Sequence, residues 1–134
     1  MQQEILETLQ DRLVSAEILE YIARNTDDTS AQGEEVRSAL FEQCWQEFGE
    51  VEGALRKLLK LDDCDEVQDL LAQALLDIHI HPNTGLVYDS AALWEAQYRW
   101  LHLYYRGGEE RYMDQAKLCD GIRHAQVEKV EEGD

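Results

Sequence analysis

Lysine and arginine are absent from residues 61–98, although this stretch holds eight carboxylates. A helix selected for stability alone would alternate acids with bases, because like charges three or four residues apart destabilise a helix by about 0.2–0.5 kcal/mol per pair. The whole chain has 29 acidic and 12 basic residues, a net charge of −17. Such a field repels nucleic acids and anionic membranes and attracts basic proteins. We therefore expect no direct binding to nucleic acid or to a membrane.

The chain also lacks a run of 18 apolar residues, so no segment is expected to span a membrane. Its first residues, MQQEILETLQDRL, are acidic and amphipathic, which differs from a signal peptide. Cys44, Cys64 and Cys119 are odd in number and far apart, and the first and last lie on apolar helical stripes. We expect reduced, buried thiols at those two positions and a cytoplasmic protein.

Signatures of catalysis are missing as well. The sequence has no phosphate-binding glycine loop, no GxSxG motif and no CxxC pair. We expect the protein not to be an enzyme and to carry no cofactor.

The apolar residues that are present recur at helical spacing. With 44% hydrophobic residues in 134, the chain can form one domain with a core. The predicted fold class is all-α, a single compact bundle of five to six helices over residues 1–126, followed by an acidic, frayed tail at 127–134. The predicted helices cover residues 3–24, 34–61, 64–78, about 90–106 and 109–126.

Glycine and proline mark the expected interruptions. Gly49 and Gly53 fall inside the long stripe of 34–61, and we favour a break near Gly49. The single proline, Pro82, places a turn between helices, with a very short hairpin near residues 78–88 as an equal alternative to a plain loop. Thr29, or its rival Ser30, caps the helix that follows residue 30, and Asp63 starts the helix at 64.

Two helices are predicted to have extensive apolar faces. In the first, Ile18 or Leu19 and Ile22 are expected to face inward. The helix near 90–106 carries aromatic residues almost all round, so we expect it at the centre of the bundle. One face has Trp94, Tyr98, Leu101 and Tyr105, and the adjoining face has Leu93, Trp100 and Tyr104.

Carboxylates form two predicted rows on the outer sides of helices. Glu4, Glu7 and Asp11 make the first row, and the second follows steps of three and four from Asp62 through Glu66, Asp69 and Gln73 to Asp77. Neither row contains a lysine or arginine between its first and its last acid. From the local density of acids we predict these partner-binding residues: Asp27, Asp28, Glu34, Glu35, Asp62, Asp63, Asp65, Glu66, Asp69 and Asp77.

Rows of carboxylates about 5–6 Å apart can imitate the spaced phosphates of a nucleic acid. We therefore expect a non-catalytic inhibitor that binds the basic, nucleic-acid-binding surface of a partner protein by charge mimicry. Small acidic proteins of phages and mobile elements that block CRISPR or restriction complexes have this physical profile. An immunity protein or antitoxin that caps a basic toxin is the alternative in the same class.

Two alternatives come from other classes. Asp77, His79 and His81 alternate in a way that could start a metal site, which would suit a small metal-dependent hydrolase. We expect ordinary loop histidines and no bound metal instead. The second alternative is a structural subunit that self-associates along the aromatic helix, at Trp100 if that residue is exposed, so a monomer and a homodimer both remain open.

Overall fold

The computed structural model describes the backbone of residues 2–27, 29–78 and 90–132 and the side chains of 3–27, 29–76 and 90–125. The described residues contain five α-helices and no strand, which confirms the predicted all-α fold class. The helices are α1 (Gln2–Arg24), α2 (Ala31–Leu61), α3 (Asp65–Ile78), α4 (Ser90–Gly107) and α5 (Glu110–Glu132).

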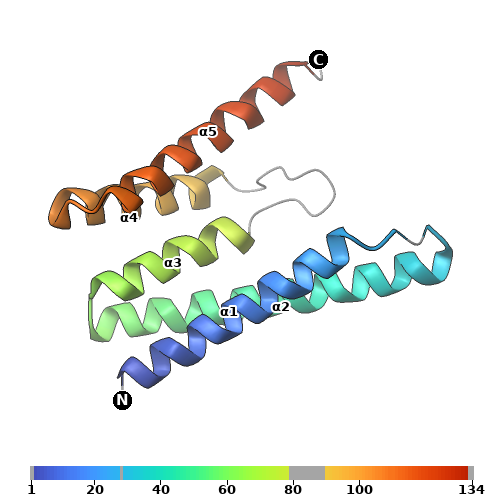
Figure 1. Cartoon of the computed structure of the whole chain (residues 1–134), viewed down its shortest axis with the longest axis horizontal. Coiled ribbons are helices and arrows are strands. Elements are labelled where there is room, and N and C mark those ends of the chain that lie inside the picture. The colour runs from blue at the N-terminus through green and yellow to red at the C-terminus, as the bar shows by residue number, and fades with distance from the viewer. Residues whose placement is uncertain (1, 28, 79–89, 133–134) are drawn as a thin grey trace.

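The helices are arranged around α3. Figure 1 shows the antiparallel pair α1 and α2 on one side of α3 and the pair α4 and α5 on the other. Helix α3 packs against α1, α2 and α4, whereas α4 packs against α3 and α5. The expectation that the aromatic helix lies at the centre is therefore wrong, and the short acidic helix α3 occupies that place.

All five helices contribute side chains to one apolar core. Burying a large aliphatic or aromatic side chain contributes about 1.5–3 kcal/mol, so these residues supply most of the driving force for the fold. The largest side chains with almost no exposed surface are Leu13, Phe48, Leu55, Leu71, Leu75, Leu93, Trp100 and Leu103.

Helix α2 runs without interruption through both of its central glycines, so the predicted break near Gly49 is wrong. Gly49 and Gly53 are exposed rather than part of the apolar stripe, because Phe48, Val51 and Leu55 carry the packing on the opposite side. The helix begins after Ser30, whose Oγ accepts a hydrogen bond from the Gly33 amide at 3.1 Å. Ser30, and not Thr29, is therefore the N-cap.

The inward face of α1 differs from the prediction in its last turns. Ala16 and Ala23 are fully buried, whereas Ile18 and Ile22 are 53% and 48% exposed. The helix turns its small residues toward the neighbouring α2, which lets the two backbones pack closely. Ile18 and Ile22 consequently lie on the solvent side with Val14 and Tyr21.

Helix α4 also buries one of its two apolar faces and leaves the other exposed. Ala92, Leu93, Ala96, Trp100 and Leu103 form its buried face. Its exposed face carries Trp94, Tyr98 and Tyr105. Trp100 is fully buried and is not available for contact with another chain, whereas self-association through the exposed edge of α4 stays a prediction.

Two predicted segments lie near the ends of described helices. The predicted hairpin at 78–88 falls outside the described residues except for Ile78, the last residue of α3. Helix α5 extends to Glu132, which places most of the predicted tail at 127–134 within the helix. Within the described part of the chain, every helix is too short or too polar to cross a bilayer.

Candidate functional site

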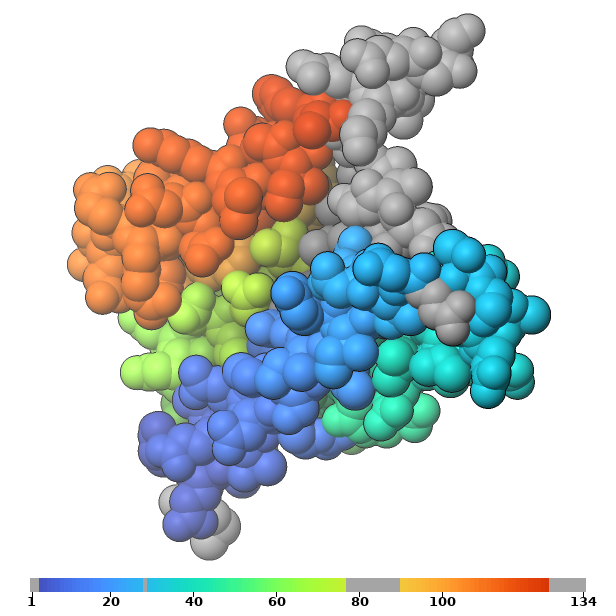
Figure 2. All heavy atoms as spheres, turned by 45° about the vertical axis from the view of Figure 1, so that its right-hand side comes forward, coloured from blue at the N-terminus to red at the C-terminus, as the bar shows by residue number. Residues whose placement is uncertain are grey.

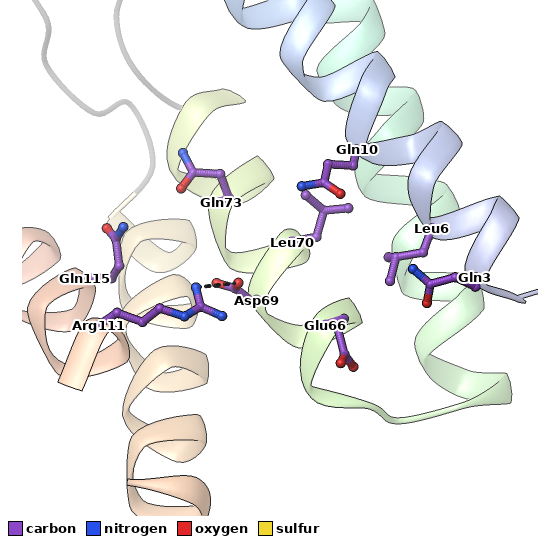
Figure 3. Close-up of a pocket in the computed structure, with 9 residues that line it drawn as sticks. All are labelled: Gln3, Leu6, Gln10, Glu66, Asp69, Leu70, Gln73, Arg111 and Gln115. Carbon is purple, nitrogen blue, oxygen red and sulfur yellow. Dashed lines mark hydrogen bonds and ion pairs between the residues drawn. The ribbon is translucent and has the colours of Figure 1, made fainter. Parts of the chain in front are cut away.

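A groove of about 430 Å³ lies where α3 is exposed between α1 and α5, and we call it the α3 groove. Figure 2 shows the green atoms of α3 between the blue atoms of α1 and the orange atoms of the last two helices. Figure 3 shows the side chains that line the groove. Glu66, Asp69, Leu70 and Gln73 form its floor, Gln3, Leu6 and Gln10 line the α1 wall, and Arg111 and Gln115 line the α5 wall.

The floor of the groove is the acidic row predicted on α3. Val67, Leu71 and Leu75 point into the core, so residues at the complementary helical positions must face outward. Glu66 is exposed, and Asp69 and Gln73 are partly exposed. The sequence therefore predicted the orientation of this row, although it did not predict the helices that wall it.

The expectation that the row lacks basic neighbours is wrong for Asp69, whereas Asp62 and Glu66 form no ion pair with a described residue. Asp69 accepts a hydrogen bond from Trp100 Nε1 at 2.8 Å through Oδ1 and one from Arg111 Nη1 at 3.1 Å through Oδ2. Asp65 forms an ion pair with Arg106. The bases come from α4 and α5, far along the chain, so the local sequence around α3 did not reveal them.

A second polar network joins α2, α3 and α4 away from the residues that line the groove. Arg56 bridges Glu52 and Glu95, with its Nη2 2.9 Å from Glu95 Oε1. Arg99 donates to Glu95 Oε2 at 2.9 Å and to Gln68 Oε1 at 2.6 Å. Burial by itself raises the pKa of Glu95, but the hydrogen bonds from Arg56 and Arg99 outweigh it and hold that pKa below its usual value.

This network is suited to holding helices together rather than to catalysis. Gln68 is 6% exposed and completes the chain by donating to Asp63 Oδ1 at 2.7 Å. Every carboxylate in the network accepts a hydrogen bond, so none is left poised as a general base. Asp63, one of the predicted partner-binding residues, is engaged within the molecule.

Charge pairing on the α1–α2 pair is less complete. Arg12 donates a hydrogen bond to Glu47 Oε2 at 3.0 Å. It also donates one to Glu50, and that second hydrogen bond lowers the pKa of Glu50. The predicted outer row of Glu4, Glu7 and Asp11 is exposed, and its three carboxylates make no ion pair with another described residue.

The other predicted partner-binding residues fall into two distant groups. Asp27, Glu34 and Glu35 are exposed at the start of α2, and Asp62 is exposed just after its end. At 1.5 Å per residue, Glu35 and Asp62 are about 40 Å apart along the helix axis. Asp28 and the side chain of Asp77 lie outside the described residues. The ten predicted acids therefore do not form one surface.

The cysteines differ in accessibility. Burial raises the pKa of Cys44 and that of Cys119 to about 11, so both stay protonated and unreactive at neutral pH. Cys64 is partly exposed and lines a hollow of about 300 Å³ that adjoins the α3 groove and shares Gln3, Leu6 and Glu66 with it. All three thiols are free.

No three His, Cys, Asp or Glu side chains among those described come together as metal ligands. His79, His81 and the side chain of Asp77 lie outside that set, so the metal-site alternative stays a prediction.

Sequence reasoning missed the two walls of the groove. Gln3, Gln10, Arg111 and Gln115 were not singled out, because uncharged amides on a surface helix carry no distinctive pattern. One signal was available: residues 99–127 hold five bases and four acids, unlike the acidic rest of the chain. Two of those bases, Arg106 and Arg111, pair with acids of α3.

The fold and the groove define an all-α domain with an acidic surface. No family model, curated protein or solved structure matches the chain, so its function is argued from geometry and charge.

Proposed function

We propose that the protein is a non-catalytic inhibitor that binds the basic, nucleic-acid-facing surface of another protein by charge mimicry. Phage or mobile-element proteins that block CRISPR or restriction complexes act in this way, and we place this protein in the same functional class. The partner is a basic nucleic-acid-binding protein or complex, met in the cytoplasm.

The observation that carries the proposal is the acidic row on α1. Glu4, Glu7 and Asp11 are exposed, follow steps of three and four, and form no ion pair with a described residue, since the nearby Arg12 pairs with Glu47 and Glu50 instead. Their spacing of about 5–6 Å presents successive negative charges along one line. An arginine- or lysine-lined surface can pair with such a row without any rearrangement of this protein.

The distribution of ion pairs among the helices also supports partner binding through α1. Arg106 and Arg111 neutralise acids on α3, whereas residues 1–61 keep 13 acids against 6 bases. The outer pair α1 and α2, with the loop between them, therefore keeps an excess of seven negative charges. Asp65 and Asp69, which are held by those arginines, leave the set of partner-binding residues, and Glu4, Glu7 and Asp11 enter it.

Capture of partners from host lysate, followed by binding assays with the purified partner, tests the proposal. We expect affinity to fall steeply between about 50 mM and 200 mM salt, and double-stranded DNA or RNA to displace the protein. The variant Glu7→Lys/Asp11→Lys should bind at least about tenfold more weakly. Glu110→Lys/Asp114→Lys, an equally spaced pair on α5, is the matched control and should lose less than about twofold.

Binding that is indifferent to salt and to nucleic acid would contradict charge mimicry. A captured toxin that loses its activity without competition from nucleic acid would identify an immunity protein instead.

A further inference from the structure

The α3 groove has hydrogen-bonding groups on all three of its sides. Four glutamines face it: Gln3 and Gln10 from α1, Gln73 from α3 and Gln115 from α5. A glutamine side chain offers both a carbonyl acceptor and N–H donors, the same groups that a peptide backbone presents. The amides of Gln10 and Gln115 make no hydrogen bond to other described residues, and the amide of Gln3 makes one long contact of 3.4 Å with Glu7.

The charge of the groove selects a cationic occupant. Asp69 is neutralised by Arg111, but Glu66 is exposed and has no ion pair with a described residue. Asp62 adds a second exposed carboxylate in the adjoining hollow. A lysine or arginine side chain would meet two carboxylates there, while an acidic peptide, a nucleic acid or a second copy of this chain would be repelled.

The shape of the groove suits an extended chain. Glu66 and Gln73 lie about 10 Å apart along α3, which is the length of three residues in extended conformation. Leu70, which is partly exposed, lies in the middle and offers apolar surface for the aliphatic part of a lysine or arginine, while Leu6 beside it is mostly buried. The adjoining hollow continues the path past Glu66 to Asp62 and Cys64.

We infer that the α3 groove binds an extended, lysine- or arginine-bearing segment of a partner protein. The glutamines of the walls pair with the backbone amides of the segment, and Glu66 and Asp62 bind its cationic side chain. This inference rests on the proposed function, because the segment belongs to the same basic partner that the outer acids of α1 attract.

Cys64 allows the inference to be tested on the intact protein. The probe is a short peptide of alternating lysine and alanine with an N-terminal chloroacetyl group, whose chloride is displaced by a thiolate to form a thioether. Cys44 and Cys119 are buried, so Cys64 is the accessible thiol. Adduct formation is followed by mass spectrometry and peptide mapping, and each rate is divided by the iodoacetamide rate of the same variant to correct for thiol reactivity.

We expect the lysine peptide to alkylate Cys64 at least about fivefold faster than the same peptide with acetylated lysines. Glu66→Lys should remove about fivefold of the rate, whereas Glu42→Lys, the same charge change at an exposed site on α2, should remove less than about twofold. Gln10→Ala/Gln115→Ala should slow the reaction about threefold, and Gln43→Ala on α2 should leave it unchanged.

Equal rates for the charged and acetylated peptides, or equal losses in Glu66→Lys and Glu42→Lys, would overturn the groove assignment. Salt-dependent binding through Glu7 and Asp11 would then still stand. Conversely, partner binding that does not change with salt would contradict charge mimicry without affecting the measured rates of Cys64 alkylation. The failure of one proposal can therefore be distinguished from the failure of the other.

Discussion

Glu95 illustrates how single residues set the stability of this domain. Its carboxylate accepts from Arg56 on α2 and from Arg99 on α4, and Arg99 reaches Gln68 on α3. Three helices therefore meet through one partly buried acid. Removing one partner from such a network costs more than an exposed ion pair would, because the remaining charges lose their hydrogen bonds in a region of limited solvent.

We expect Glu95→Gln to lower the free energy of unfolding by about 2 kcal/mol at pH 7. The pKa of Glu95 lies below that of an unfolded glutamate, so its stabilisation is present above about pH 4.3 and is lost as the pH falls through the folded-state pKa. Urea denaturation of both proteins across pH 3–7 should show the difference shrinking toward low pH.

The matched control is Glu42→Gln, at an exposed site on α2. It should change stability by less than about 0.5 kcal/mol at every pH. A Glu95→Gln deficit that stays constant from pH 7 to pH 3 would show that the carboxylate charge is not what stabilises the junction.

At the scale of helices, much of the fold could be predicted from the sequence. Apolar residues at a period of 3.6 located all five helices, because a helix must bury one face. The same pattern could not show that α2 continues past Gly49, since a solvent-facing glycine costs only about 1 kcal/mol against a long packed stripe. The pattern also could not predict which aromatic face of α4 is buried. Trp94 and Trp100 are equivalent in the sequence, and their burial depends on which face a neighbouring helix covers.

The candidate site was less predictable than the helices. Glu66 and Asp69 were found from the row of acids on α3. Their surroundings depend on pairs such as Asp69 with Trp100 and Asp69 with Arg111, which lie 31 and 42 residues apart in the chain. Such distant pairs depend on how helices pack, which local spacing does not encode.

The continuity of α2 gives a prediction for its second glycine. A Cβ built at Gly53 would meet no atom within 4 Å. We expect Gly53→Ala to raise the free energy of unfolding by about 1 kcal/mol, since alanine has less backbone freedom to lose in a helix. Gly108→Ala is the contrasting variant: the site is equally open, but φ is +77°, so alanine should destabilise by about 1 kcal/mol. Thermal unfolding followed by circular dichroism measures both, and destabilisation by Gly53→Ala would indicate that α2 bends at this glycine.

For the whole molecule, the charge of −17 acts in opposite directions on folding and on binding. The acids of α1 and α2 repel one another in the isolated protein, while Arg106 of α4 and Arg111 of α5 form ion pairs with acids of α3. Salt screens repulsion between exposed charges beyond about 10 Å at 0.1 M, but weakens partly buried pairs less. Because acids exceed bases by 17, relief of repulsion outweighs the loss of attraction.

We therefore expect the melting temperature of the isolated protein to rise by roughly 4 °C, about 1 kcal/mol, between about 10 mM and 150 mM sodium chloride. Partner binding should weaken over the same range, because the repelling charges are the ones that attract a basic surface. Glu7→Lys/Asp11→Lys should reduce both effects together, since it removes part of the unpaired row on α1. A melting temperature that falls as salt is added would mean that the internal ion pairs dominate, and that the exposed acids are too widely spread to act as a single charged face.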